Sequence, residues 1–277
     1  MRLLHRFDSE VIMNKNFFAH TKERLREEKA VCAVFAAFAV FEIFSGFWFA
    51  AHAEARNAAL SFAYLLIIPA ALLAEWLIGI RFPALFHLLL FLLAAGGILG
   101  SCYDVYTFLP SFDEVLHGIS GILFCAVGFT LFKRILGEDE SKKAFLACLL
   151  AGILFSLAIA VLWELFEYAC YAAGGIDMQE DMIIDGFGSY LLSGSHNETV
   201  VIDGITQTVI HYGDGQTYVI EGGYLDIGLY DTLNDMLVCT LGCALFALAL
   251  IADRKLKGKL KRLLIGRLTP ANREKSE

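Results

Sequence analysis

Three short segments of this chain each carry two ionisable side chains at a spacing of three or four residues. The pairs are Asp113 with His117, Glu164 with Glu167, and Asp231 with Asp235. Residues at this spacing lie on one face of an α-helix. Five carboxylates and one imidazole form a ligand set suited to Mg²⁺, Mn²⁺, Ca²⁺, Fe²⁺ or Zn²⁺. The pattern therefore predicts a site for one or two divalent cations with ligands drawn from these six side chains, and with His117 as a candidate catalytic residue.

The composition is that of a polytopic membrane protein. The chain has 277 residues, of which 57% are apolar, and its mean hydropathy is +0.61. Six apolar stretches are long enough to cross a bilayer, which takes about 20 residues. They lie near 30–50, 57–80, 82–102, 115–132, 144–172 and 236–252. The expected fold class is therefore an all-α polytopic membrane protein with six transmembrane helices.

Basic residues orient these spans, because Lys and Arg are retained on the cytoplasmic side during insertion. A six-span topology places 21 of the 22 Lys and Arg residues on one side, with Arg56 as the exception. No Lys or Arg occurs between Ala144 and Asp253. Both termini are therefore expected in the cytoplasm, and each ionisable pair is expected at the outward end of its helix. Basic residues that flank membrane spans argue against nucleic-acid binding.

This topology divides the chain into a basic cytoplasmic segment, 1–29, a membrane domain, 30–252, and a basic cytoplasmic tail, 253–277. The membrane domain includes a long outward loop, 174–235, which contains eleven acidic residues after Gly174 and no Lys or Arg. Three short segments of this loop alternate in polarity or carry β-branched side chains. They are 198–203, 205–212 and 216–221. Glycine turns separate them, so a small antiparallel β-meander is expected in the loop.

Three further ionisable residues lie within the predicted spans. Glu42 falls deep in the first span, where a charge is costly, so we expect it to be protonated, packed against a neighbour or in a water-filled pocket. Glu75 and His87 lie closer to the cytoplasmic ends, where we expect interfacial water to solvate them. Glycines of the fourth and sixth spans are expected to permit close helix approach: Gly118, Gly121 and Gly242.

Four segments carry a resemblance to a known family: FDEVLHGISG, WELFEY, GGIDMQEDMIID and YDTLNDMLVCTLG. Their order and membrane placement resemble the YjdF-like family of bacterial integral membrane proteins, which is distantly similar to the VanZ-like proteins linked with glycopeptide-antibiotic tolerance. The resemblance covers roughly residues 60–252. It implies a compact multi-pass helical domain in the bacterial cytoplasmic membrane, with the six paired residues at the motif positions. An insertion around 190–222 distinguishes this chain from shorter members.

The leading functional hypothesis is a metal-binding protein of the bacterial envelope that acts as an enzyme on a lipid-linked or cell-wall substrate at the outer leaflet. The cation would polarise a phosphoryl or carbonyl oxygen or activate water, while His117 or a carboxylate handles the proton. The chain has no G-x-S-x-G, H-E-x-x-H or Walker A motif. Two alternatives remain open: a proton- or cation-coupled carrier, and a noncatalytic envelope partner protein whose outward loop contacts another protein.

Overall fold

The structure is a computed structural model that describes residues 16–137, 139–254 and 260–268. Parts of the predicted N-terminal segment and of the predicted tail therefore lie outside the described residues. The chain forms two compact units. The helical unit comprises Met1–Ile159 and Val238–Glu277, and the loop unit comprises Ala160–Leu237. The boundary between the two units falls within two long helices.

Six helical spans confirm the predicted fold class. They are α2 (Lys29–Ala51), α3 with α4 (Ala55–Ile78), α5 with the π-helical segment η3 (Ala84–Cys102), α7 (Phe112–Leu136), α8 (Lys142–Gly174) and α10 (Leu229–Asp253). Each span has between 19 and 33 residues and is apolar enough to cross a membrane. Many large apolar side chains of these helices are exposed on the protein surface, as expected where lipid rather than water surrounds a helix.

The second span is broken into two helices, α3 (Ala55–Tyr64) and α4 (Ile67–Ile78). Pro69 has no backbone N–H and cannot bond to the carbonyl of Leu65, four residues earlier. The Leu65 carbonyl accepts a hydrogen bond from the N–H of Ile68 instead, at 3.3 Å. The break therefore has a local cause in the sequence.

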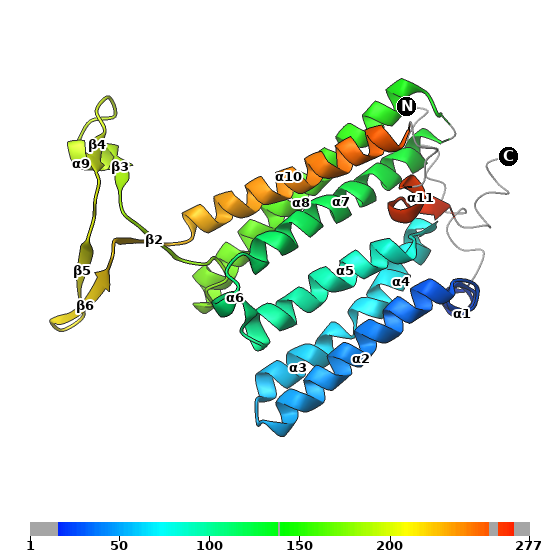
Figure 1. The fold of residues 1–277 in the computed structure, drawn as a ribbon, viewed down its shortest axis with the longest axis horizontal. Helices are drawn as coiled ribbons and strands as arrows, with labels where there is room; N and C mark the ends of the chain where they lie inside the picture. The colour runs from blue at the N-terminus through cyan, green and yellow to red at the C-terminus, as the bar shows by residue number, and fades with distance from the viewer. Residues whose placement is uncertain (1–15, 138, 255–259, 269–277) are drawn as a thin grey trace. The chain divides into compact units, whose positions relative to one another are not determined.

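Aromatic packing joins the helices of the helical unit. In Figure 1, α5 (Ala84–Gly97) runs beside both α2 and α7, and it contacts both. The buried core between α2, α4 and α5 consists of Val31, Phe35, Phe38, Leu72, Phe91 and Ala95. The rings of Phe38 and Phe91 are stacked with their centroids 4.4 Å apart. Stacked aromatic rings stabilise one relative position of the two helices, in addition to the stabilisation that close packing gives.

Glycines bring α7 and the inner part of α10 together within the helical unit. A Cβ atom on Gly121 would collide with the carbonyl oxygen of Cys239, and one on Gly242 would collide with the carbonyl oxygen of Gly118. Only glycine permits this backbone approach, so the predicted role is confirmed for Gly121 and Gly242. A Cβ atom on Gly118 would lie 3.4 Å from Cγ1 of Val238, an ordinary contact, so this position does not require glycine.

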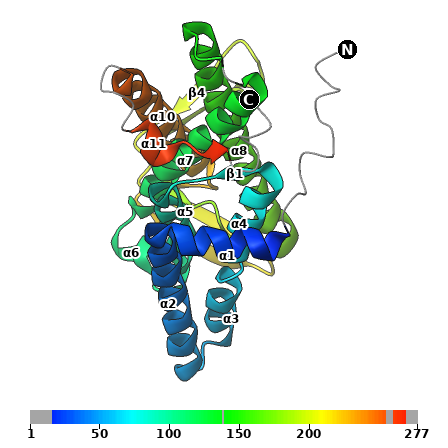
Figure 2. The same ribbon diagram turned by 90° about the vertical axis from the view of Figure 1, so that its right-hand side faces the viewer.

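Short elements cover one end of the helical unit. The helix α1 (Phe17–Glu27) runs across the end of α2 in Figure 2 and contacts both α2 and α4. Strand β1 (Ile80–Arg81) pairs antiparallel with β8 (Arg267–Leu268), which follows the one-turn helix α11 (Lys261–Leu264). Residues 17–27 before the first span and residues 261–268 after the last span therefore both pack against the helices of this unit.

The loop unit contains three antiparallel strand pairs. Strand β2 (Met182–Ile184) pairs with β7 (Tyr224–Asp226), β3 (Phe187–Ser189) with β4 (Val200–Ile202), and β5 (Gln207–Tyr212) with β6 (Gln216–Glu221). The β5–β6 hairpin matches the segments predicted at 205–212 and 216–221. The predicted first strand, 198–203, contains β4, which pairs with β3 and not with β5. The N–H of Ile205 bonds to the carbonyl of Asp185 at 2.7 Å, which turns the chain away from β4 before β5 begins.

Candidate functional site

Three of the predicted site residues converge in the loop unit. Glu164 and Glu167 lie in the C-terminal part of α8, and Asp235 lies in the second turn of α10. One carboxylate oxygen of each residue lies within 4.8 Å of those of the other two. All three residues are buried, with exposed fractions of 6%, 6% and 1%, respectively. We call these three residues the carboxylate cluster.

The carboxylate cluster concentrates negative charge away from water. Two ionised carboxylates separated by 4.8 Å repel each other by about 3 kcal/mol at an effective dielectric constant near 20. Burial adds to this cost because it disfavours the charged form of each carboxyl group. No Lys or Arg occurs in the sequence of the loop unit. Protons or a bound cation are two ways to lower the repulsion, and carboxylates can bind either.

A tryptophan orients one member of the cluster. The indole Nε1–H of Trp163 donates a hydrogen bond to Oε1 of Glu167 at 2.7 Å. The two residues are four apart on α8, so their side chains lie on one face of the helix. A hydrogen bond to an ionised carboxylate is stronger than one between neutral groups, and this bond therefore favours one orientation of the Glu167 carboxylate.

Asp231 ties a loop to the start of α10. Its Oδ2 accepts a hydrogen bond from the backbone N–H of Glu180 at 3.0 Å. Beside it, Nε2 of Gln179 donates to Oγ1 of Thr232 at 2.6 Å. These bonds hold the segment between α8 and β2 against the first turn of α10. That Asp231 also binds a cation stays a prediction.

Further acidic residues near the start of α10 lie at the end of β7 and on the segment between α8 and β2. Oδ2 of Asp226 accepts a hydrogen bond from the N–H of Tyr230 at 2.8 Å, which satisfies one of the first backbone donors of the helix. Burial raises the pKa of the Asp181 carboxyl above its usual range, and the charges of Asp177 and Asp226 raise it further. The segment therefore favours a protonated Asp181 more strongly than water does.

Asp113 and His117 form a pair within the helical unit. Nε2 of His117 lies 3.4 Å from Oδ2 of Asp113, so the spacing of four residues does place the two side chains together on α7. His117 is buried, while Asp113 is half-buried. A nearby carboxylate favours the protonated imidazole, whereas burial disfavours it. The catalytic role of His117, and cation binding by the six paired residues, stay predictions.

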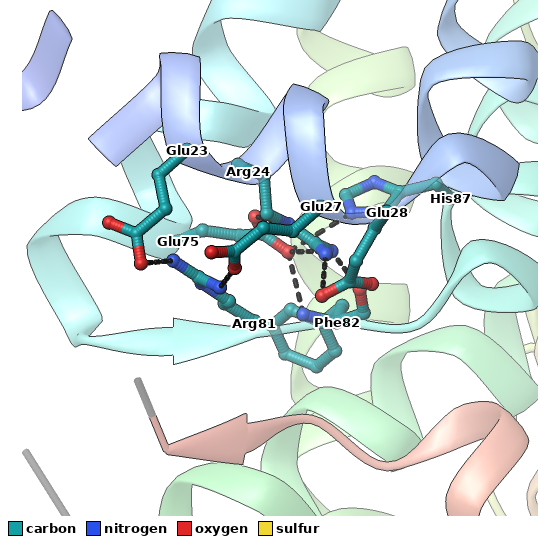
Figure 3. Close-up of polar contacts among 8 residues, drawn as sticks. All are labelled: Glu23, Arg24, Glu27, Glu28, Glu75, Arg81, Phe82 and His87. Atoms are coloured by element: carbon teal, nitrogen blue, oxygen red, sulfur yellow. Dashed lines mark hydrogen bonds and ion pairs between the residues drawn. The ribbon is translucent and has the colours of Figure 1, made fainter. Parts of the chain in front are cut away.

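The sequence did not predict a buried polar network in the helical unit, which Figure 3 shows. Nε and Nη2 of Arg24 donate to the two carboxylate oxygens of Glu75, at 3.0 and 3.2 Å. Nε2 of His87 lies 3.0 Å from Oε1 of Glu75, and the N–H of Phe82 donates to the same oxygen at 2.6 Å. Nη2 of Arg24 also donates to the carbonyl of Phe82. The network joins α1, α4 and α5.

The expectation that interfacial water solvates Glu75 and His87 is wrong. Each is 1% exposed, and Arg24 is fully buried. Helix α1 covers this end of the helical unit, and Arg24 supplies the opposite charge for Glu75. Burial opposes the charge of the guanidinium, yet the pairing with Glu75 outweighs it and raises the pKa of Arg24 above its ordinary value. The partners are 51 residues apart, so no local pattern indicated the contact.

Comparison with known proteins identified one family. A family model described as "Predicted membrane protein (DUF2238)" matches residues 30–255. No curated protein and no solved structure matches the chain. The matched residues include all three ionisable pairs and Glu75, whereas Arg24 precedes them.

Proposed function

Because this chain belongs to the DUF2238 family of predicted membrane proteins, the YjdF-like family, we propose that it is an integral membrane protein that binds a divalent cation through Glu164, Glu167 and Asp235. The observation that carries the proposal is the convergence of three buried carboxylates, with oxygens within 4.8 Å of one another. Three anionic oxygen ligands from two helices resemble the way in which helical bundles present carboxylates to metals.

The chemistry of the ligands favours a hard cation. Carboxylate oxygens suit Mg²⁺, Ca²⁺ and Mn²⁺, whereas thiolate ligands select softer metals. A divalent ion reduces the charge of three ionised carboxylates from −3 to −1 in one binding event. The hydrogen bond from Trp163 supports this proposal because it fixes the orientation of the Glu167 carboxylate, one of the three ligands.

We extend the proposal to an enzyme that acts on a lipid-linked or cell-wall substrate. The distribution of Lys and Arg predicts that the C-terminal end of α8 and the N-terminal end of α10 face outward. A bound cation there would act as a Lewis acid on a phosphoryl or carbonyl oxygen. The residues of this chain would hold the ion and orient its ligands: Glu164 and Asp235 as ligands, and Glu167 as the ligand positioned by Trp163.

The cation site is tested by Mn²⁺ binding to the purified full-length protein in detergent, followed by electron paramagnetic resonance. We expect stoichiometric binding by the wild type. Glu164→Gln and Asp235→Asn should each weaken binding by more than about 10-fold, because each removes an anionic ligand. Glu198→Gln is the matched control, since Glu198 is an exposed acid of the same unit. Equal Mn²⁺ binding by all four proteins, or none by the wild type, would refute the site.

Three further outcomes separate the functions that such a site could serve. Metal-dependent hydrolysis of a lipid-linked phosphate substrate, lost in Glu164→Gln at an unchanged melting temperature, supports the enzyme. Flux of protons or cations in vesicles, lost in the same variant, replaces the enzyme with a carrier. A lower melting temperature on metal removal, without either activity, makes the ion structural and overturns the catalytic part of the proposal.

A further inference from the structure

Glu42 is a fully buried carboxyl group near the middle of the first span. It lies 13 residues after the start of α2 and 9 before its end, which corresponds to about 20 Å and about 14 Å along the helix axis. Its exposed fraction is 0%. Neither carboxylate oxygen has a hydrogen-bond partner in the described part of the chain. This residue belongs to the helical unit and plays no part in the proposed cation site.

An ionised Glu42 would be costly in this position. The titratable side chains that interact with it electrostatically include Tyr64 of α3 and Cys102 of η3, which are neutral near pH 7 and supply no positive charge. Burial of an ionised carboxylate without a partner costs several kcal/mol, and a group in this situation takes up a proton instead. A neutral carboxylic acid removes the charge and can lie in a packed interior. The surroundings of Glu42 therefore suit the protonated form.

Two hydroxyl groups, those of Ser45 and Tyr103, lie between Glu42 and the C-terminal end of α2. Ser45 is three residues further along, so its side chain lies on the same helix face, and it is fully buried. Oη of Tyr103 donates a hydrogen bond to Oγ of Ser45 at 3.1 Å. Tyr103 is half-buried and directly follows η3 (Ile98–Cys102), a π-helical turn of the kind often found at functional sites. The chain of polar groups thus leads from the buried carboxyl to a partly exposed phenol.

We propose that Glu42 is an intramembrane proton-binding site, and that Ser45 and Tyr103 connect it with the membrane face at which η3 ends. A hydroxyl group can donate one proton and accept another, so a proton that enters at Oη of Tyr103 is matched by one that leaves Oγ of Ser45. Rotation of the Glu42 side chain toward Ser45 completes the path. The ligand is a proton, and its uptake neutralises the carboxylate.

Dicyclohexylcarbodiimide tests the protonation state of Glu42 in the full-length protein. This apolar reagent adds to protonated carboxyl groups, and the adduct rearranges to a stable acylurea that contains all atoms of both reactants. Mass spectrometry should find the adduct on Glu42 near neutral pH and less of it at higher pH. Glu54 is the matched control, because it is exposed and accepts a hydrogen bond from Asn57 at 2.7 Å. Modification of Glu54 but not Glu42 would count against the proposal.

Infrared spectroscopy gives a second readout that does not depend on reagent access. The wild type should show a carboxylic acid carbonyl band that is lost in Glu42→Gln, a variant that keeps the size of the side chain. If the spectra of the two proteins are the same in this region, Glu42 is ionised and the proposal is overturned. In D₂O, Tyr103→Phe should slow the deuterium shift of this band. Exchange at the wild-type rate would overturn the assigned path.

Discussion

Replacing Arg24 with methionine should release α1 from the helical unit. Methionine has an unbranched side chain, as arginine does. It lacks the guanidinium that bonds to both carboxylate oxygens of Glu75 and to the carbonyl of Phe82. As long as α1 stays docked in the variant, Glu75 is buried with His87 and the N–H of Phe82 as its polar neighbours. The loss leaves a buried carboxylate without its cationic partner, which is the costly way to break such a pair.

The burial of the Arg24–Glu75 pair determines how much free energy of α1 docking is lost. Arg24 is fully buried and Glu75 is 1% exposed, so water screens the pair very little. Removing one partner of a buried pair costs about 3 to 5 kcal/mol. Since each 1.4 kcal/mol corresponds to a factor of ten, the protection of α1 amides against hydrogen exchange should fall by roughly 10²- to 4 × 10³-fold. The amide protection of α1 cannot fall below that of a helix that no longer packs against the unit, and this sets the largest change that can be measured.

Hydrogen exchange with mass spectrometry measures this directly on peptides from residues 17–27. Arg26→Met is the matched control, because Arg26 lies on the same helix and is exposed. Peptides from the middle of α2 should keep their protection in both variants, since local opening of α1 does not unfold the spans. Less than about a 10-fold change in Arg24→Met would refute the reasoning. Adding Glu75→Gln to Arg24→Met should restore part of the protection, because it removes the buried charge.

Three other predictions concern pH, helix packing and the loop. Burial, and then the charge of Arg81, lowers the pKa of His20 below its ordinary 6.5, so the undocked state binds more protons and stability should fall as the pH drops below about 6.5. His20→Gln should melt with a weaker pH dependence, and an unchanged slope would contradict this. Gly121→Ala should destabilise the protein by about 1 to 3 kcal/mol, because the new methyl group collides with a backbone carbonyl. Gly118→Ala, whose methyl group would lie 3.4 Å from Val238, should melt close to the wild type, and equal melting of the two variants would contradict the packing argument. Gly215 has φ +80, so Gly215→Ala should destabilise the β5–β6 hairpin by about 1 kcal/mol, seen as faster amide exchange there; unchanged exchange would contradict it.

Features that depend on neighbours along the chain were predictable. The spans follow from the length of apolar sequence that a bilayer requires, and the β5–β6 hairpin follows from alternating residues around a glycine turn. The contact between Asp113 and His117 follows from helical spacing alone. Strand β3, which pairs with β4, was not among the predicted segments, because strand pairing depends on the path of the intervening chain as well as on strand propensity.

The sequence alone therefore determines where the six spans lie and which ionisable residues share a helix face, because both depend on the repeat of a single helix. Only the tertiary structure decides which faces meet. Contact between distant segments depends on the rotation and crossing of packed helices, which the spacing within one helix does not specify. For this reason the structure was needed to bring Glu164 and Glu167 to Asp235, to join Arg24 to Glu75, and to surround Glu42 without a hydrogen-bond partner among the described residues.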